Sequence, residues 1–306
     1  MTSIECRLIN ACAAAYQIAG GVIPEQPYLS QVGLAAGTQP AVFVDGTRHV
    51  NAGYVCQTSD DWVIVVFRGT LPPFSGNFWS WVDDWLQDFK AGPIDWYVNG
   101  AKFGRVETGF SDAVLNLWPQ AKAAIDAIDL SRKKGILVTG HSKGAAMTFL
   151  VASLLKAAYP HMLVEAHAFA APLVTDRSFV SNYDTLGLDA VTVRYQNADD
   201  LVPFLPWWPS FGLLATTERR HGDGTNHVVT AHSFPTAIEN DYVAPGSLRF
   251  ITPSCTLEYG PKAQADAWAA LKHALEHFEF EKIVDAHSAA GRYLTCTCQA
   301  SMQPTV

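Results

Sequence analysis

The chain has 306 residues, of which 49% are hydrophobic and only 16% charged, and its net charge is −8. This composition excludes an intrinsically disordered chain, and the negative charge excludes nucleic acid and anionic membrane surfaces as primary partners. No apolar stretch is long and uninterrupted enough to predict a transmembrane segment. Because no linker, repeat or low-complexity stretch divides the chain, we expect residues 1–306 to form a single domain.

The N-terminal segment at 8–19 is apolar, but Glu5 precedes it and polar residues interrupt it. We interpret it as an amphipathic helix rather than a convincing signal peptide, which favours a cytoplasmic location or secretion without a leader. The six cysteines are too few and too scattered for a disulfide scaffold. A disulfide from Cys6 or Cys12 to one of the two cysteines at 296 and 298 is an open alternative. It is not the favoured one, because cytosolic thiols remain reduced.

Further along the chain, β-branched and apolar runs alternate with helical patterns. The runs predict strands at 62–67, 136–139, 164–170, 190–195 and 248–251, and the patterns predict helices at 110–128, 145–158 and 263–283. Strands that alternate with helices imply right-handed crossovers and a mostly parallel central sheet with helices on both faces. The predicted fold class is therefore α/β, and any chemistry is expected at the carboxyl ends of the strands.

The pentapeptide Gly-His-Ser-Lys-Gly at 140–144 lies between such a strand and such a helix. A strand that turns sharply into a helix through G-x-S-x-G holds its serine in a strained conformation with the hydroxyl exposed. The helix that begins just after Ser142 also directs unpaired N–H groups toward any oxyanion formed there. We therefore predict that Ser142 is a nucleophile.

A serine nucleophile needs an imidazole to take its proton and a carboxylate to orient that imidazole. In hydrolases of this topology the chain order is Ser, then acid, then His. Asp200 is the favoured acid because it follows a strand through a turn and precedes an anchoring Leu-Val-Pro. The residues themselves leave four other carboxylates open as the acid, at Asp176, Asp184, Asp189 and Asp199.

Three blocks in the right order resemble class 3 (fungal-type) lipases. They are Phe-Arg-Gly-Thr at 67–70, Gly-His-Ser-Lys-Gly at 140–144 and Asn-Ala-Asp-Asp-Leu-Val-Pro-Phe-Leu-Pro at 197–206. The resemblance implies an α/β-hydrolase fold and ester hydrolysis without a cofactor. It places the nucleophile on Ser142, the acid on Asp200 and the base on His287, and it gives the oxyanion hole to Thr70 and the backbone N–H of Lys143. We call the strand-to-helix turn at 140–144 the elbow. In and directly after it, Lys143 and Ala145 replace the family's commoner Leu and Gly.

Aromatic side chains follow both the predicted oxyanion residue and the predicted acid, and they bear on the substrate. We expect Phe78, Trp81, Phe204 and Trp207 to form an acyl-binding wall or a lid, with ordinary core packing as the alternative. The expected activity is that of a triacylglycerol lipase or esterase acting on a lipid or other ester, with transient contact to a lipid interface. The alternatives are a phospholipase A1, a feruloyl-type esterase, or a catalytically silent hydrolase-like binding protein.

A competing motif, His-Ala-Leu-Glu-His at 273–277, fits the H-x-x-E-H zinc pattern. Both histidines lie nearly opposite the apolar stripe of their predicted helix, so a solvated polar face is the favoured interpretation. The stretch that contains His221, His227 and His232 has no diagnostic ligand spacing either. We therefore expect no metal site.

Overall fold

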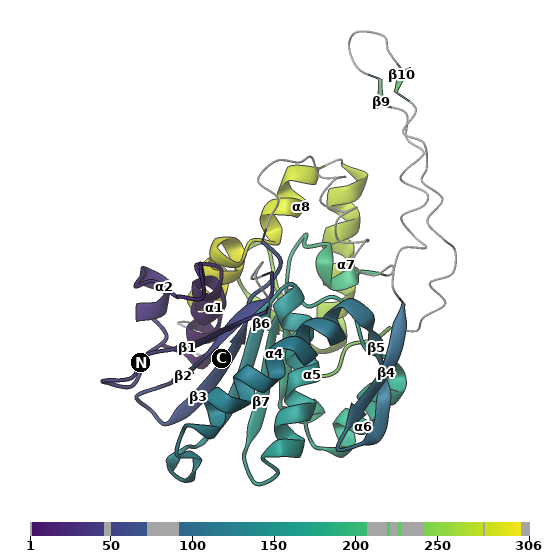
Figure 1. Cartoon of the computed structure of the whole chain (residues 1–306). Helices are drawn as coiled ribbons and strands as arrows, with labels where there is room; N and C mark the ends of the chain where they lie inside the picture. The colour runs from purple at the N-terminus through teal and green to yellow at the C-terminus, as the bar shows by residue number, and fades with distance from the viewer. Residues whose placement is uncertain are drawn as a thin grey trace.

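The computed structural model describes residues 2–45, 50–71, 92–206, 219–220, 226–227, 242–277 and 279–300. Its centre is an eight-stranded sheet in the order β1-β2-β3-β6-β7-β8-β11-β12 (Figure 1). Neighbouring strands from β3 to β11 pair in parallel, whereas β1, β2 and β12 add antiparallel pairings at the two edges. The strands are β1 (Ala41–Val44), β2 (Ala52–Gln57), β3 (Trp62–Phe67), β6 (Gly135–His141), β7 (Val164–Phe169), β8 (Thr192–Asn197), β11 (Ser247–Ile251) and β12 (Leu257–Tyr259). The predicted mostly parallel α/β sheet is confirmed.

Both faces of the sheet are covered, which explains why the β3 sequence is apolar without alternation. Val63, Val65 and Phe67 point into one buried cluster, and Ile64 and Val66 point into the other. Helices α4 (Thr108–Asp126), α5 (Lys143–Ala158), α6 (Arg177–Thr185) and α7 (Gly260–Glu276) contribute to the first cluster. The second cluster is formed with α1 (Ile4–Ala15), the π-type turn η4 (Ala289–Tyr293) and α9 (Leu294–Ala300).

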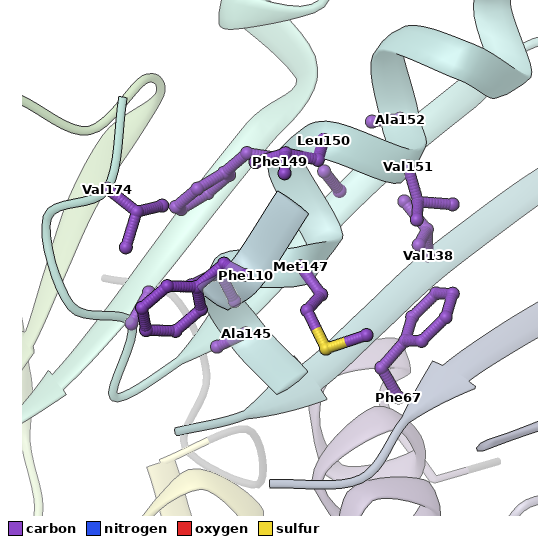
Figure 2. Packing of buried hydrophobic residues seen from close by; sticks show 14 of the residues in the cluster. Phe67, Phe110, Val138, Ala145, Met147, Phe149, Leu150, Val151, Ala152 and Val174 are labelled. Carbon is purple, nitrogen blue, oxygen red and sulfur yellow. The ribbon is translucent and has the colours of Figure 1, made fainter. Parts of the chain in front are cut away.

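The first cluster packs α4 and α5 against the sheet. Figure 2 shows Phe110 of α4, Met147 and Phe149 of α5, and Phe67 and Val138 of the strands within one buried cluster, with Met147 nearest Phe67. All five side chains are buried. At roughly 1.5–3 kcal/mol for each large apolar side chain, this contact holds the start of α5 firmly against the strand ends.

One helix prediction is wrong. The pattern at 263–283 predicts a single helix, but the structure divides it into α7, which ends at Glu276, and α8 (Phe280–Ala286). The Glu279 N–H donates to the carbonyl of Ala274, and Glu279 itself leaves the helical region at φ −80°, ψ 50°. Such a bond closes a helix C-terminus, so the apolar periodicity continues through a turn that it does not reveal.

The remaining elements lie outside the main sheet. Strands β4 (Pro93–Val98) and β5 (Ala101–Glu107) form an antiparallel hairpin, and β9 (Arg219–Arg220) pairs with β10 (Asn226–His227). The short helices are α2 (Pro27–Ser30), η1 (Leu130–Arg132), η2 (Asp189–Val191) and η3 (Val202–Phe204). Among the described residues, no helix has both the length and the hydropathy needed to cross a membrane.

Two disulfides tie the C-terminal end to the rest of the molecule. Cys6 of α1 bonds to Cys298, and Cys255 bonds to Cys296. Of the two N-terminal partners that the sequence leaves open, the structure therefore uses Cys6, and Cys12 is a buried free thiol. Both bonds end on α9, immediately after the segment that carries His287 and Tyr293.

Candidate active site

Ser142 occupies a strained turn between β6 and α5. Its backbone has φ 64° and ψ −128°, a region that residues with a side chain rarely adopt, and its N–H donates to the carbonyl of Phe169 at 2.8 Å. A Cβ added to Gly140 would lie 2.3 Å from the Gly144 backbone, and one added to Gly144 would lie 2.1 Å from the Phe67 carbonyl oxygen. Only glycine fits at either position, so these two residues allow the elbow to close.

The structure brings Ser142, His287 and Asp200 together in one hydrogen-bond chain. Ser142 Oγ lies 2.7 Å from His287 Nε2, and His287 Nδ1 lies 3.0 Å from each carboxylate oxygen of Asp200. All three residues are buried, with Asp200 fully inaccessible to solvent. Because the acceptor-only carboxylate faces Nδ1, the ring carries its proton there and leaves Nε2 to accept the serine hydroxyl.

Asp200 is held by donors on two sides besides the imidazole. The Val202 N–H donates to Oδ1 at 3.0 Å, and the Tyr293 hydroxyl donates to Oδ2 at 2.7 Å. Burial, and next the charge of Asp200, raise the pKa of Tyr293 well above its usual range, so the phenol keeps the proton that it donates. The Asn197 N–H in turn donates to the Tyr293 oxygen at 2.9 Å.

We call residues 279–300 the C-terminal arm, because they deliver His287 to the sheet. The Asn197 side-chain amide donates to the Ala286 carbonyl at 2.8 Å, directly before His287. Asn197 therefore connects the end of β8 both to the arm and, through Tyr293, to Asp200. Sequence reasoning treats Asn197 as part of a turn and misses this bridging role, because only the fold brings the two segments together.

Three of the four other carboxylates considered from the sequence have different partners. Asp199 pairs with the Lys282 ammonium at 3.2 Å rather than with an imidazole. Asp176 accepts the Phe179 N–H at 2.7 Å as the N-cap of α6, and Asp189 accepts the Gly246 N–H at 2.6 Å. These contacts leave Asp200 as the carboxylate that faces His287.

Thr70 and Lys143 lie at the same edge of the sheet as Ser142. A Cβ added to Gly69 would lie 3.0 Å from the Ser142 Cβ, so the backbone that leads to the exposed Thr70 passes directly beside the serine. Lys143 is the first residue of α5, where backbone N–H groups have no partner within the helix. Their role as donors to an oxyanion remains a prediction.

Of the predicted substrate-binding aromatics, Phe78, Trp81 and Trp207 lie outside the described residues. Phe204 lies in η3 and is nearly buried, with its ring centroid 5.4 Å from that of Trp268 on α7. Phe204 thus packs onto the first buried cluster, a few residues after Asp200. Its contact with a substrate remains a prediction.

The structure does not assemble a ligand set around the competing histidines. His273 and His277 are exposed with their rings stacked at 4.1 Å, and the His277 Nδ1–H donates to the His273 carbonyl at 2.8 Å. Within the described ranges, no three His, Cys, Asp or Glu side chains come together as a metal site. His221 and His232 lie outside those ranges.

Known proteins similar to this chain are lipases. Residues 64–209 match the sequence model of the family described as lipase (class 3). The secreted mono- and diacylglycerol lipase 3 of Gibberella zeae is 33% identical over 116 residues, 37% of this chain. That match spans only 36% of the relative's own length.

Solved structures share the fold at low sequence identity. The triacylglyceride lipase of Rhizomucor miehei aligns with a TM-score of 0.58 at 19% identity, over 82% of this chain and 80% of that one. A triacylglycerol lipase whose catalytic centre is a serine protease triad aligns with a TM-score of 0.60 at 18% identity, over 85% and 87%. The fold is that of the α/β-hydrolases, and residues 64–209, just under half of the chain, resemble the class 3 lipase family.

Proposed function

We propose that the protein is a serine carboxylic-ester hydrolase of the triacylglycerol lipase or esterase type. The observation that carries this proposal is the hydrogen-bond chain from Ser142 Oγ through both ring nitrogens of His287 to Asp200. Proton transfer to an oriented imidazole turns a serine hydroxyl into a nucleophile, and the strained elbow presents that hydroxyl at the sheet edge. In this proposal Ser142 is the nucleophile, His287 the base and Asp200 the orienting acid.

Acylation follows from these positions. Ser142 Oγ attacks the ester carbonyl while His287 Nε2 takes its proton, and the buried Asp200 carboxylate stabilises the imidazolium that forms. The backbone N–H groups of Thr70 and Lys143 bind the oxyanion, where loss of one donor typically costs about 3 kcal/mol of transition-state stabilisation. His287 then gives its proton to the leaving alkoxide, and the acyl group stays on Ser142.

Deacylation uses the same groups in the reverse order. Water replaces the alcohol, His287 removes a proton from it, and the resulting hydroxide attacks the acyl carbonyl. The second tetrahedral intermediate collapses, the Ser142 oxygen recovers a proton from His287, and the carboxylic acid departs. Proton and charge balance are complete with these side chains and water, so the proposed cycle needs no cofactor.

Glycerolipid esters are the substrate class that we propose. The relative from Gibberella zeae is named for mono- and diacylglycerols, and the solved relatives are triacylglycerol lipases. Sequences rich in aromatic residues flank both Thr70 and Asp200, in keeping with an acyl-binding surface and transient contact with a lipid interface. Phe78, Trp81, Phe204 and Trp207 are the proposed contact residues.

An active-site probe tests the nucleophile directly. A fluorophosphonate should label the wild type once, at Ser142, and Ser142→Ala should abolish both labelling and p-nitrophenyl ester turnover. Ser111→Ala is the matched control, because Ser111 is also fully buried and its Oγ has no hydrogen-bond partner in the described part of the chain. Esterase activity that survives Ser142→Ala would refute the assignment.

A substrate panel then separates the activities that one fold can host. We expect measurable hydrolysis of mono-, di- and trioleoylglycerol, and less of phosphatidylcholine or methyl ferulate. Preference for the phospholipid or the ferulate, with Ser142 still labelled, would keep the mechanism and replace the substrate class.

A further inference from the structure

A second imidazole lies beside the one that faces Ser142. His141, the residue before the serine, is buried, and its ring centroid lies 4.8 Å from that of His287. The Tyr293 ring packs edge-on against the same imidazole at 5.4 Å. Two imidazoles at this distance repel each other if both are protonated, so the charge state of His141 affects the proton transfer at His287.

Tyr16 supplies the hydrogen bond that orients this second ring. It follows α1 directly, and its hydroxyl lies 2.8 Å from His141 Nδ1. A Cβ added to Gly69 would lie 2.1 Å from the Tyr16 oxygen and 3.0 Å from the Ser142 Cβ. The Tyr16 hydroxyl therefore occupies the junction between the end of β3 and the elbow.

The surroundings define which partner donates. Burial, and next the neighbouring His287, hold the pKa of His141 well below its usual 6.5, so this ring stays neutral. Burial also raises the pKa of Tyr16 above its usual range, so the phenol keeps its proton. A protonated phenol that donates to Nδ1 leaves the His141 proton on Nε2.

We propose that Tyr16 and His141 form a positioning pair, in which the Tyr16 hydroxyl holds His141 as a neutral Nε2–H imidazole packed against His287. The proton taken from Ser142 is then confined to His287, next to Asp200. This inference rests on the proposed function, because it concerns the same proton transfer. The titratable and charged groups around the pair are Cys12 from α1, Arg68 after β3, Asp200 after β8, and His287 and Tyr293 from the C-terminal arm.

Among these neighbours, none offers His141 an ion-pair partner. Burial raises the pKa of the Cys12 thiol to about 12, so it stays uncharged. The Arg68 guanidinium donates to the backbone carbonyls of Ile18 and Val50, and its positive charge opposes a second cation nearby. The Asp200 carboxylate is directed at His287 Nδ1. A positive charge is therefore stabilised on His287 and disfavoured on His141.

Tyr16→Phe tests the pair because it keeps the ring and removes only the hydroxyl. We expect kcat for a soluble p-nitrophenyl ester to fall about fivefold, the effect of one buried hydrogen bond, while KM stays within about twofold. Tyr54→Phe is the matched control, since the buried Tyr54 hydroxyl also makes one hydrogen bond, to the Ala11 carbonyl of α1, 3.0 Å away. Its kcat should equal that of the wild type.

Nitrogen-15 NMR of labelled histidine gives a readout that a purely structural role would not move. In the wild type, His141 should remain a neutral Nε2–H tautomer between about pH 5 and pH 8, and Tyr16→Phe should mix the two tautomers. Titration of His141 in the wild type, or an unchanged tautomer in Tyr16→Phe, would overturn the pair.

Fluorophosphonate labelling separates this inference from the function on which it rests. If Ser142 is labelled and Tyr16→Phe matches Tyr54→Phe in kcat, the positioning pair is wrong and the esterase proposal stands. If Ser142 is not labelled even in the wild type, the esterase proposal fails and the pair loses its catalytic role with it.

Discussion

The elbow at 140–144 and the C-terminal arm at 279–300 hold the two ends of one hydrogen-bond chain by different physical means. The elbow is closed by backbone contacts, with Gly140 and Gly144 in spaces that admit no side chain. The arm is held by side chains and covalent bonds from distant segments, through Asn197 and the disulfides that end at 296 and 298. The strain at Ser142 is thus carried by a rigid local frame, whereas the position of His287 depends on long-range packing.

Helix α1 is connected to both regions. α1 reaches the elbow through Tyr16 and His141, and it reaches the arm through the bond from Cys6 to Cys298. A change in α1 should therefore alter the approach of His287 to Ser142 before it disturbs the elbow itself.

The largest effect is expected when the imidazole that the arm carries, or the carboxylate that faces it, is removed. His287→Ala and Asp200→Asn should each lower kcat by about 10⁴-fold, because in the proposed mechanism the serine loses its base or the base loses its tautomer. Steady-state ester hydrolysis measures this, with circular dichroism as the check on folding.

His277→Ala is the matched control for that loss, because His277 is an exposed imidazole outside the hydrogen-bond chain, and it should retain wild-type kcat. A His287→Ala variant within about tenfold of the wild type would mean that another residue serves as the base.

The arm can also be released without touching its chemistry. Cys6→Ser combined with Cys298→Ser opens a link between residues 292 positions apart, and the free energy of unfolding should fall by about 4 kcal/mol. Urea titration measures the change. Cys56→Ala is the control, a buried free thiol whose loss should cost only about 1 kcal/mol of packing. Equal losses in the two variants would show that the disulfide does not stabilise the arm.

A single added methyl group at Gly144 should prevent the elbow from closing. In Gly144→Ala the new Cβ would lie 2.1 Å from the Phe67 carbonyl oxygen, and β3 cannot yield because it pairs on both sides. We expect a loss of about 3 kcal/mol in thermal unfolding, together with loss of fluorophosphonate labelling.

Gly20→Ala separates that clash from backbone strain. Gly20 has φ +57° but open space around its Cβ position, so alanine there should cost only about 1 kcal/mol and leave labelling unchanged. A Gly144→Ala protein as stable as Gly20→Ala would mean that the elbow can relax.

The same contrast explains how much could be predicted from the sequence. The elbow can be predicted from the sequence because its signals are local. An apolar strand, two glycines around Ser142 and a helical pattern lie within about twenty residues. The parallel sheet follows from the same alternation. His287 is different, since ten histidines compete and only a family resemblance selects it.

Long-range partners are what the sequence could not reveal. Tyr16 and His141 are 125 residues apart, and Asn197 and Tyr293 are 96 apart, so no periodicity links them. The break between α7 and α8 is not visible in the sequence because apolar spacing runs through it, with Ile283 still buried. The Cys255 to Cys296 bond likewise depends on where the turn between β11 and β12 meets α9 in the fold.

The smallest expected effect sharpens the role of α1. The Arg7 guanidinium bonds both oxygens of Asp60, at 2.9 and 3.0 Å, and this pairing lowers the pKa of Asp60 from 3.8 to about 2. Because the folded pKa lies below the unfolded one, the stabilisation is complete above about pH 4 and is lost as the pH falls toward about 2. Asp60→Asn should therefore lower the free energy of unfolding by about 1 kcal/mol at neutral pH, since water partly screens the pair.

Urea unfolding of wild type and Asp60→Asn across that pH range tests the sign: the difference between them should shrink to zero as the pH falls. Asp126→Asn is the control, because Asp126 lies exposed on α4, where it pairs with Lys122 and accepts from the Tyr159 hydroxyl, and it should contribute no more than about 0.5 kcal/mol. If α1 positions Tyr16 as inferred, Asp60→Asn should also lower kcat slightly. The backbone of the elbow at Gly140 and Gly144 should stay unchanged. If kcat equals that of Asp126→Asn, the pair of Arg7 and Asp60 contributes only to stability, and the start of α1 does not influence the elbow.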